Sequence, residues 1–470
     1  MYKQIRDYLA RDIYPFHMPG HKRNPQFMPP NLYELDLTEI PGMDVLSTPT
    51  GMIYDLQQKI ANFYGADHSF FLVNGSSAGI IAAICATCAD GDTLVVPRNA
   101  HASVYNGMVL SGAVPMYIMP QFTTDGLAGG ICPSALDDMP QGAAVLVVSP
   151  TYEGFVSDIQ AIAQKVHSRG GILIIDEAHG AHFAFHKRFP VSALQLGADI
   201  VVQSLHKTLP APSQCAVLHV KNGRVDVNRI KFLINAVQTS SPSYILMAVC
   251  DFVLQKLWQQ PELFDAYVER LDNFRAAAVT SLRARPAIFL THESCRSSSH
   301  EVKNSAIFAT DPGKLLFTTP YDAETIAQAM AREYKVQVEM AAGRYILAMT
   351  SVADTDEGFD RLKRAIVGYG QVVAKTGVCN GISAVGASPR PTANLIPEMV
   401  IPPREAVRMP SLEIPWEEAA GQISAQLIAK YPPGIAIVAP GERIPHSIDK
   451  QSETIRIITS SRPVAGNLEG

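Results

Sequence analysis

Two stretches, ILIIDEAHGAH at residues 172–182 and IVVQSLHKTL at residues 200–209, decide the fold. Each begins with a short run of aliphatic residues and ends in polar, ionisable ones. The runs are apolar throughout, which is typical of strands buried on both faces in a parallel sheet covered by helices. Five similar runs lie between residues 69 and 220: SFFLV, TLVVP, VPMYIM, AVLVVS and CAVLHV. Together they predict an α/β domain with a seven-stranded, mainly parallel sheet.

The rest of the chain divides around this sheet. A domain usually has about 100–200 residues, so 470 residues predict several domains. We expect KLLFTT and RYILAMT to be strands and DAETIAQAMAREY to be a helix in a second, smaller unit. A further helix is expected near WEEAAGQISAQLIAKY. The predicted parts are a proline-rich N-terminal arm (1–49), a large α/β domain (50–290), a small α+β domain (291–375), a Gly/Ser/Pro-rich linker (376–394) and a C-terminal domain (395–470).

Composition excludes several classes of protein. Hydrophobic residues make up 47% and charged residues 18%, a globular balance, and a net charge of −5 without a basic domain argues against nucleic acid as a partner. Cys85 and Cys88 form a CxxC with no second pair at zinc spacing, so we interpret them as a buried helix face. Pro19 and Gly20 break the spacing of His17 and His21, and we predict no metal site. The first residues are unlike a signal peptide, and no apolar run reaches the ~18–20 residues of a membrane span, so we expect a cytoplasmic protein with no membrane partner.

Polar groups follow five of the predicted strands. Ligands bind open parallel sheets at the carboxyl ends of the strands, so these groups should converge on one edge of the sheet. The five segments are Asn74–Gly79, Arg98–His101, Pro150–Tyr152, Asp176–His179 and Ser204–Lys207.

Three of these segments suggest one cofactor. Small residues and two hydroxyls at the start of a helix, around Ser76, can bind a phosphate, although taken alone this pattern is more often an ordinary capped helix start. Asp176 ends an apolar strand, where it serves either as a loop cap or ion-pair partner or as the partner of a protonated ring nitrogen. Lys207 is either a solvated surface residue or a desolvated amine that forms a Schiff base. Taken together, they match pyridoxal 5′-phosphate (PLP).

At this point the sequence resembles the bacterial-type ornithine/lysine/arginine decarboxylases, a family of fold type I PLP enzymes. The resemblance covers nearly the whole chain, in the expected order. It implies the aspartate aminotransferase fold for the large domain. The segments that carry it are FHMPGHKRN (16–24), FYGADHSFFLVNGSSAG (63–79), PRNAHASVYNG (97–107), SPTYEG (149–154), IDEAHGAH (175–182), QSLHKTLPAPSQ (203–214), QTSSPSY (238–244) and YPPGI…PGE (431–442).

The resemblance also implies roles for individual residues. Lys207 would form the Schiff base, and Asp176 would keep the pyridine nitrogen protonated. His101 would stack on the ring, and His179 would lie near the phenolic oxygen. Residues 238–244 would help to complete the neighbouring subunit's site, as expected of a homodimer or a dimer of dimers with shared active sites. The remaining cofactor ligands are expected at Ser76, Ser77, Ala78, Thr151, Ser204 and His206.

Two departures from the family accompany this resemblance. Ala102 stands where the family often has a lysine after the stacking histidine. The N-terminal wing of the long inducible enzymes is absent, which argues against the large ring assemblies that depend on it.

The expected activity is decarboxylation of a basic amino acid to its amine and CO2. An aminotransferase is the alternative; such enzymes hold the substrate α-carboxylate with an arginine, and our register places Ile346 at that position with Arg344 two residues away. A catalytically inactive homologue is a second alternative, although the residues named above are all present. Glu339 and Glu442 are candidate acids for the far end of the substrate, each with an ordinary surface role as the alternative. The resemblance favours arginine or lysine over ornithine, and it leaves open the proton donor and the physiological role, polyamine biosynthesis or acid consumption.

Overall fold

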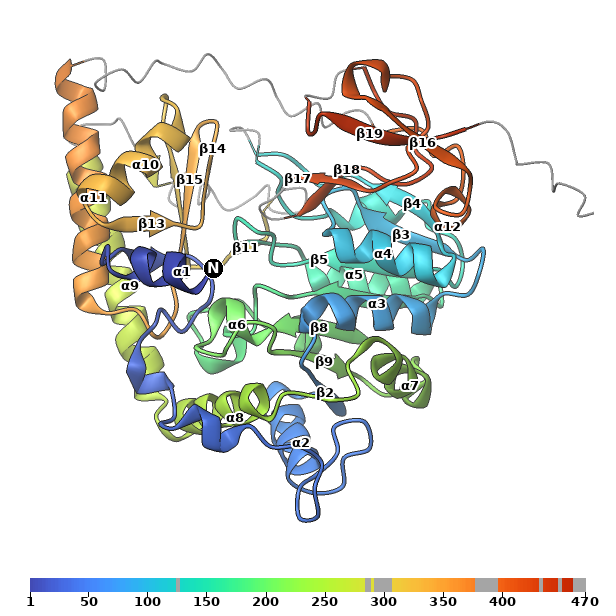
Figure 1. The fold of residues 1–470 in the computed structure, drawn as a ribbon, viewed down its shortest axis with the longest axis horizontal. Helices are drawn as coiled ribbons and strands as arrows, with labels where there is room; N and C mark the ends of the chain where they lie inside the picture. Colours follow the sequence, from blue (N-terminus) through green and yellow to red (C-terminus); the bar gives the residue numbers. More distant parts are fainter. Residues whose placement is uncertain are drawn as a thin grey trace, which may run out of the picture.

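The computed structural model describes residues 1–123, 127–283, 289–290, 307–376, 396–430, 434–446 and 450–459. At its centre lies a seven-stranded sheet with the order β2-β9-β8-β7-β5-β3-β4 (Figure 1). The only antiparallel pairings in this sheet are those of β9 with β2 and β8, so the mainly parallel sheet predicted from the seven runs is confirmed. Its strands are β2 (His68–Leu72), β3 (Thr93–Pro97), β4 (Val114–Ile118), β5 (Ala144–Val148), β7 (Ile172–Asp176), β8 (Ile200–Ser204) and β9 (Ala216–Val220).

Helices cover both faces of this sheet, which explains why its strands are apolar throughout. Ile174 packs into the hydrophobic cluster on one face, whereas Leu173 and Ile175 pack into the cluster on the other. The helices on the first face are α3 (Gly75–Thr87), α4 (Ala102–Ser111) and α7 (Val227–Val237). Those on the second face are α2 (Met52–Tyr64), α5 (Ile159–Ser168) and α8 (Tyr244–Gln259).

A glycine brings α3 close to the sheet. A Cβ atom on Gly79 would lie 2.7 Å from Leu72 Cδ1 and 2.9 Å from a methyl group of Val202. Only a residue without a side chain permits this approach. The N-terminus of α3 is therefore held directly beyond the end of β2.

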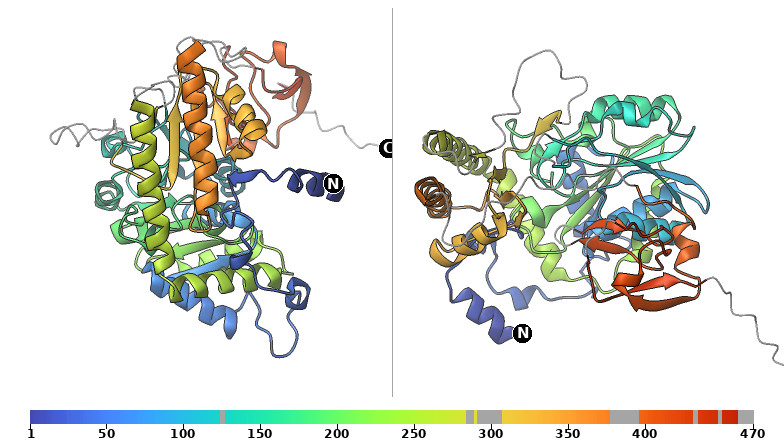
Figure 2. Two further views of the ribbon diagram at one scale, coloured as in Figure 1. Left: turned by 90° about the vertical axis from the view of Figure 1, so that its left-hand side faces the viewer. Right: turned by 90° about the horizontal axis from the view of Figure 1, so that it is seen from above.

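A smaller α+β unit packs beside the large sheet (Figure 2). Its four-stranded sheet has the order β10-β12-β15-β14, and the long helices α9 and α11 lie next to each other along it. The two strands and the helix predicted here, β12, β15 and α10, all form. The elements are α9 (Glu262–Arg283), β10 (Phe289–Leu290), β12 (Lys314–Thr318), α10 (Ala323–Glu333), β13 (Val336–Val338), β14 (Met340–Ala342), β15 (Tyr345–Met349) and α11 (Asp356–Thr376). A short pairing of β11 (Ala309–Thr310) with β6 (Phe155–Val156) joins this unit to the large domain.

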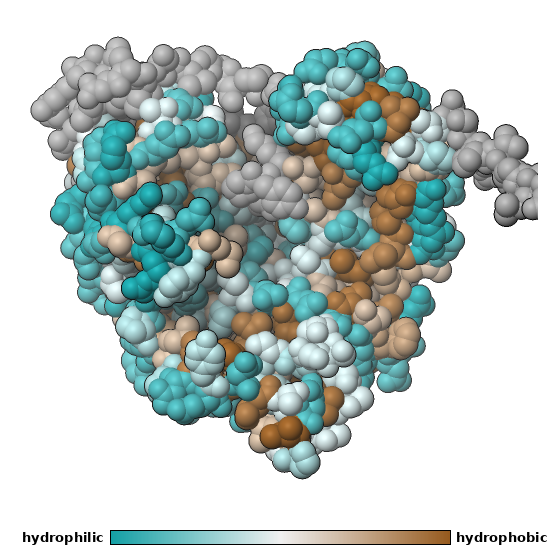
Figure 3. All heavy atoms as spheres, viewed as in Figure 1, coloured by the Kyte–Doolittle hydropathy of each residue, from teal (hydrophilic) through white to brown (hydrophobic). Residues whose placement is uncertain are grey.

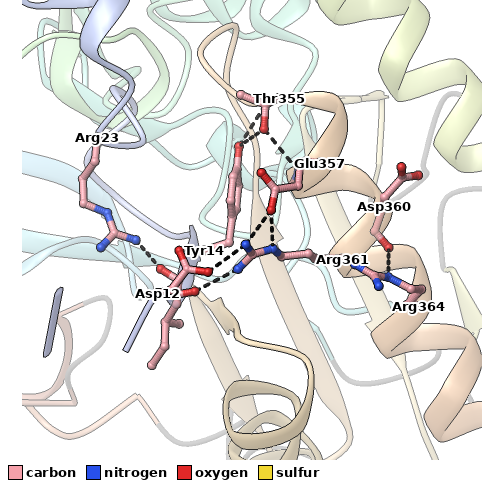
Figure 4. A network of polar contacts seen from close by, with 10 residues as sticks. Asp12, Tyr14, Arg23, Thr355, Glu357, Asp360, Arg361 and Arg364 are labelled. Atoms are coloured by element: carbon pink, nitrogen blue, oxygen red, sulfur yellow. Dashed lines mark hydrogen bonds and ion pairs between the residues drawn. The ribbon is translucent and has the colours of Figure 1, made fainter. Parts of the chain in front are cut away.

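The N-terminal arm is attached to this small unit. It begins with α1 (Tyr2–Leu9), which buries no residue, and continues into β1 (Tyr14–Phe16), which pairs in parallel with β13. In the polar network of Figure 4, Arg361 on α11 binds Asp12 at 2.8 Å, and the Tyr14 hydroxyl accepts a hydrogen bond from the Thr355 amide at 2.8 Å.

The C-terminal residues form two small antiparallel sheets beside α4 (Figure 1). The helix predicted near WEEAAGQISAQLIAKY is wrong. That stretch contains a single 3-10 turn, Trp416–Glu418, then Gly421 with φ +82°, and then β17. Strand pairing and burial of Trp416 and Ile428 override the local helix preference. The elements are α12 (Pro403–Ala406), β16 (Ser411–Pro415), β17 (Ile428–Lys430), β18 (Ile435–Val438) and β19 (Thr454–Ile458).

Three other expectations concern limited parts of the chain. Apart from Thr376, the predicted linker at 376–394 lies outside the described residues. Cys85 is partly buried near the end of α3 and Cys88 is buried directly after it, and both are free thiols. None of the described helices combines the length and the apolar character that crossing a membrane requires.

Candidate active site

A cavity of about 410 Å³ opens at the carboxyl edge of the large sheet. It lies where the strand-end segments were expected to meet. Among the residues that line it are these predicted site residues: Ser76, Ser77, His101, Asp176, His179, His206 and Lys207. Segments far apart in the sequence are thus brought together at one site.

Three other predicted residues lie just outside the lining. Ser204 is completely buried, and its hydroxyl donates to Ser76 Oγ at 2.7 Å, so it orients a residue of the cavity wall. Thr151 is buried, and its hydroxyl accepts from the Phe155 amide at 3.2 Å. Ala78 is buried in the first turn of α3.

One end of the cavity is built to receive an anion. Asn74 precedes α3 but makes no capping hydrogen bond with its side chain. The Gly75 amide donates to the Gln214 carbonyl oxygen at 2.9 Å, so the amides that follow Gly75 are the ones available at the start of this 13-residue helix. The hydroxyls of Ser76 and Ser77 lie at the same place. His206 is fixed by a 3.0 Å hydrogen bond from its Nδ1 to the Cys215 carbonyl oxygen, and burial lowers its pKa to about 4.

Asp176 and His101 also line the cavity. Asp176 ends β7, is buried, and accepts a hydrogen bond from the Ala178 amide at 3.1 Å. His101 precedes α4, and its Nδ1 accepts from the Ser103 amide at 3.1 Å, which leaves the ring proton on Nε2. Burial lowers the pKa of His101 although Asp176 acts to raise it. The site therefore combines a carboxylate with a neutral imidazole.

Lys207 lies on the single turn α6 (Leu205–Thr208), directly after β8. Burial lowers the pKa of its amine, while the carboxylates of Asp176 and Glu339 partly counteract that effect. Its Nζ is 3.2 Å from His179 Nε2. A partly buried lysine with a lowered pKa, facing a cavity, is the form in which an amine attacks an aldehyde.

Several residues of the site were not assigned a role from the sequence. Tyr152, from a segment that was expected at this edge, and Glu153, which was not predicted, both line the cavity, and the motif SPTYEG was the signal that could have identified Glu153. Ile435 also lines it, held by a bridge to His101 that brings the C-terminal region to the site. Lys314, at the start of β12, gave no signal, because a lysine before an apolar strand is usually exposed.

The two predicted substrate acids do not line the cavity. Glu339 accepts from the Tyr152 hydroxyl at 2.7 Å through one oxygen and from the Met18 amide at 2.9 Å through the other. Glu442 is completely buried and pairs with Arg98 at 2.9 Å. Glu339 thus connects Tyr152 of the large domain with Met18 of the N-terminal arm, and Glu442 connects the C-terminal region with Arg98 of the large domain.

The residues on which the aminotransferase alternative and the shared-site prediction depend also lie outside the cavity lining. Ile346 is buried in β15, and the exposed Arg344 donates to the Thr319 carbonyl at 3.1 Å. No arginine lies among the cavity-lining residues in the part of the chain that the structure describes. Gln238 accepts from the Val73 amide, and Tyr244 donates to the Asp44 carbonyl, so the role of residues 238–244 in a neighbouring subunit stays a prediction.

Family models match most of this chain. The model described as the major domain of Orn/Lys/Arg decarboxylase matches residues 1–326, and the C-terminal domain of the same family matches residues 390–462. The chain belongs to the Orn/Lys/Arg decarboxylase family. It is an enzyme of the decarboxylase class.

Individual relatives agree with this decarboxylase assignment. The arginine decarboxylase of Bacillus subtilis is 30% identical over 94% of this chain and 91% of its own length. The arginine decarboxylase of Bacillus cereus is 32% identical over 94% of this chain and 96% of its own. The lysine decarboxylase LdcA of Pseudomonas aeruginosa is 24% identical over 94% and 73%, respectively.

Solved structures of a lysine decarboxylase and of a serine palmitoyltransferase have a similar fold. The lysine decarboxylase of Francisella novicida superimposes with a TM-score of 0.78 at 20% identity, over 92% of this chain and 76% of that one. The serine palmitoyltransferase of Sphingomonas wittichii superimposes with a TM-score of 0.55 at 15% identity, over 77% and 87%. The predicted fold of the large domain is confirmed.

Proposed function

We propose that this protein is a PLP-dependent decarboxylase of arginine, which it converts into the corresponding amine and CO2. The observation that carries the proposal is the meeting of Lys207, Asp176 and His101 in one cavity at the sheet edge. Arginine is favoured because the relatives that are 30–32% identical over more than nine tenths of this chain include several named arginine decarboxylase.

The residues present fit PLP. Its phosphate would be held at the start of α3 by Ser76 and Ser77, with His206 nearby. Lys207 would bind its aldehyde carbon, and Asp176 would hold a proton on its ring nitrogen. When bound, the cofactor supplies an electron sink for the pair released as CO2 leaves. The protein's contribution is to orient the substrate, exclude water and place these charges in advance.

The cavity lining supports decarboxylation over transamination. An arginine that forms an ion pair with the substrate α-carboxylate would stabilise the group that has to leave as CO2 during decarboxylation. Arg344 is exposed and turned to Thr319, and apolar Ile346 stands at the register position expected of such an arginine. The carboxylate can therefore be lost into surroundings that do not stabilise it.

Glu153 is the acid that we propose for the far end of the substrate. It lines the cavity, is buried, and makes no ion pair within 4 Å with any described residue. Burial raises the pKa of its carboxyl, so a cationic partner would stabilise the charged form. A guanidinium suits this role because it can donate two parallel hydrogen bonds.

The test measures CO2 and amine from purified, PLP-loaded protein offered arginine, lysine and ornithine separately, with Lys207→Ala as the inactive control. We expect arginine to be consumed fastest. CO2 from none of the three would overturn the proposal, and keto acid without CO2 would establish the aminotransferase instead.

Two further variants locate the acid that binds the substrate head. Glu153→Gln should raise the KM for arginine about 10- to 100-fold, the effect of losing a charged hydrogen bond. Glu339→Gln is the matched comparison, because its oxygens already have partners within the chain. A rise in KM for Glu339→Gln but not for Glu153→Gln would reverse the assignment.

We also propose that two copies of the chain associate. Apolar side chains gather at the lower end of the molecule, over the arm and α2 (Figure 3). Exposed ones in this region are Tyr33, Leu37, Ile40, Val45, Met52 and Tyr54. A monomer rarely leaves so many large apolar groups together in water. Light scattering should give twice the 51.0 kDa of the chain, and a mass of 51.0 kDa would contradict the proposal.

A further inference from the structure

Three side chains form a row that starts at the cavity wall, where Lys207 and His179 lie, and continues to Lys314. Lys314 Nζ lies 2.8 Å from His179 Nδ1, and His179 Nε2 lies 3.2 Å from Lys207 Nζ. Lys314 comes from the small domain, whereas the other two come from the large one. A single imidazole thus stands between two amines.

Lys314 is held firmly in this position. It is 1% exposed and has no carboxylate within 4 Å among the described residues. A Cβ on Gly154, where φ is +96°, would lie 2.7 Å from Lys314 Cγ, so the TYEG turn leaves room for this side chain. Its ammonium lies 5.5 Å from the centre of the Tyr152 ring. A cation buried at this cost without a paired anion calls for a role beyond packing.

We propose that Lys314 is a positioning residue that fixes the ring proton of His179 on Nε2 and thereby keeps Lys207 as a free, reactive amine. A charged lysine has donors and no acceptor, so His179 Nδ1 must accept from Lys314. The neutral ring then carries its proton on Nε2, which faces Lys207. Lys207 can accept that hydrogen bond only as an uncharged amine.

The same protons could also be arranged in the opposite way, with a charged Lys207 that donates to His179 Nε2 and a neutral Lys314 that accepts from Nδ1. The hydrogen-bond distances alone do not choose between the two arrangements. The surrounding charges favour Lys314 as the charged end, because more acids act on it than on Lys207. Burial lowers the pKa of Lys314 to about 8, so it stays mostly charged at pH 7. The charged and titratable groups that act on Lys314 are Asp311, Glu339, Lys207, Glu153 and His179.

The proposal is tested on the apoprotein, without PLP or substrate. Limiting acetic anhydride labels free amines, and mass spectrometry of the Lys207 peptide from pH 6 to 10 gives the apparent pKa of Lys207. Lys314→Met, which removes the charge, should raise that pKa by at least one unit and slow labelling at pH 7 about tenfold. Lys314→Arg, which retains a charged donor, should label within about threefold of the wild type. A residue that served only for packing would leave the labelling profile unchanged.

A double-mutant cycle separates coupling through the imidazole from direct repulsion between the two lysines. His179→Leu, which can neither accept nor donate a hydrogen bond, should slow labelling as Lys314→Met does, and Lys314→Met should add little in the His179→Leu background. Full additivity, or an unchanged profile in either single variant, would overturn the proposal. If Lys314→Met does not fold, His179→Leu decides alone by the same criterion. The result is independent of the proposed function, because neither cofactor nor arginine is present.

Discussion

Replacing Glu442 by Gln should loosen the C-terminal domain without impairing substrate recognition. Glu442 is completely buried and pairs at 2.9 Å with Arg98, which follows β3 of the large sheet. Arg98 also donates to the Ile437 carbonyl at 2.7 Å and to the Tyr105 hydroxyl at 2.8 Å. The pair therefore fastens the C-terminal strands to the large domain.

The magnitude follows from this geometry. At 2.9 Å and an effective dielectric constant of about 20, the attraction between the two charges is about 6 kcal/mol. Removing one partner of a buried pair typically costs about 3–5 kcal/mol, because the other charge is left without compensation. Arg98 cannot lose its proton, and Gln retains a hydrogen-bond acceptor, so we expect a loss of about 3 kcal/mol.

The protein's two tryptophans allow this to be measured domain by domain. Trp416 lies in the core of the C-terminal domain, and Trp258 lies on α8 of the large domain. Trp258 has a buried indole nitrogen without a hydrogen-bond partner, so Trp258→Phe is a mild change. In that background, Trp416 fluorescence reports urea unfolding of the C-terminal domain. With a slope of about 1 kcal/mol per molar, Glu442→Gln should lower the midpoint by about 3 M.

The control is Glu417→Gln, which removes an exposed acid from the same domain. Its ion pair with Lys450 is solvent-accessible and should contribute less than about 1 kcal/mol. If Glu442→Gln left the urea midpoint unchanged and raised the KM for arginine tenfold or more, the structural role of Glu442 would be refuted. Glu442 would then be a substrate-binding acid.

Two further predictions concern the large domain. Gly79→Ala places a methyl group 2.7 Å from Leu72 Cδ1, so we expect it to destabilise the protein by about 1–3 kcal/mol and to weaken PLP binding, measured by urea unfolding and PLP titration; unchanged values would mean that α3 does not lie so close to the sheet. Burial lowers the pKa of His219 from 6.5 to about 3, so the unfolded chain binds one more proton at this residue between these pH values, and stability falls as the pH falls. Between pH 4 and 6, the slope of the unfolding free energy against pH should therefore be smaller in His219→Gln than in the wild type, by about 1.4 kcal/mol per pH unit. Equal slopes in the two proteins would contradict the lowered pKa.

The central sheet was predictable because one physical rule dominates there. Strands such as β7 and β8 are buried on both faces, so every residue must be apolar until the strand ends. The position of Asp176 and Lys207 at those ends then followed from the topology of a parallel sheet. Local sequence and tertiary environment point the same way in this region.

The C-terminal region shows the opposite case. The stretch from Trp416 to Lys430 has good helix formers, but it forms a turn and a strand because pairing with β18 and burial of Ile428 contribute more. Local preference could not reveal those distant partners.

Charged residues were the hardest to place, since their role depends on partners far along the chain. Glu442 and Arg98 are 344 positions apart, and Lys314 and His179 are 135 apart. In the sequence, Glu442 and Lys314 by themselves resemble ordinary surface charges.

The same long-range partners explain why the site needs more than one domain. The large domain alone supplies Lys207 and His179, but the donor that orders them, Lys314, belongs to the small domain. The turn containing Gly154, which leaves room for Lys314, is joined to the small domain by the Asp311 amide, a donor to the Gly154 carbonyl at 2.8 Å. Separation of the two domains would break this hydrogen bond and withdraw Lys314 from His179. The reactivity of Lys207 is therefore linked to domain contact through a single imidazole.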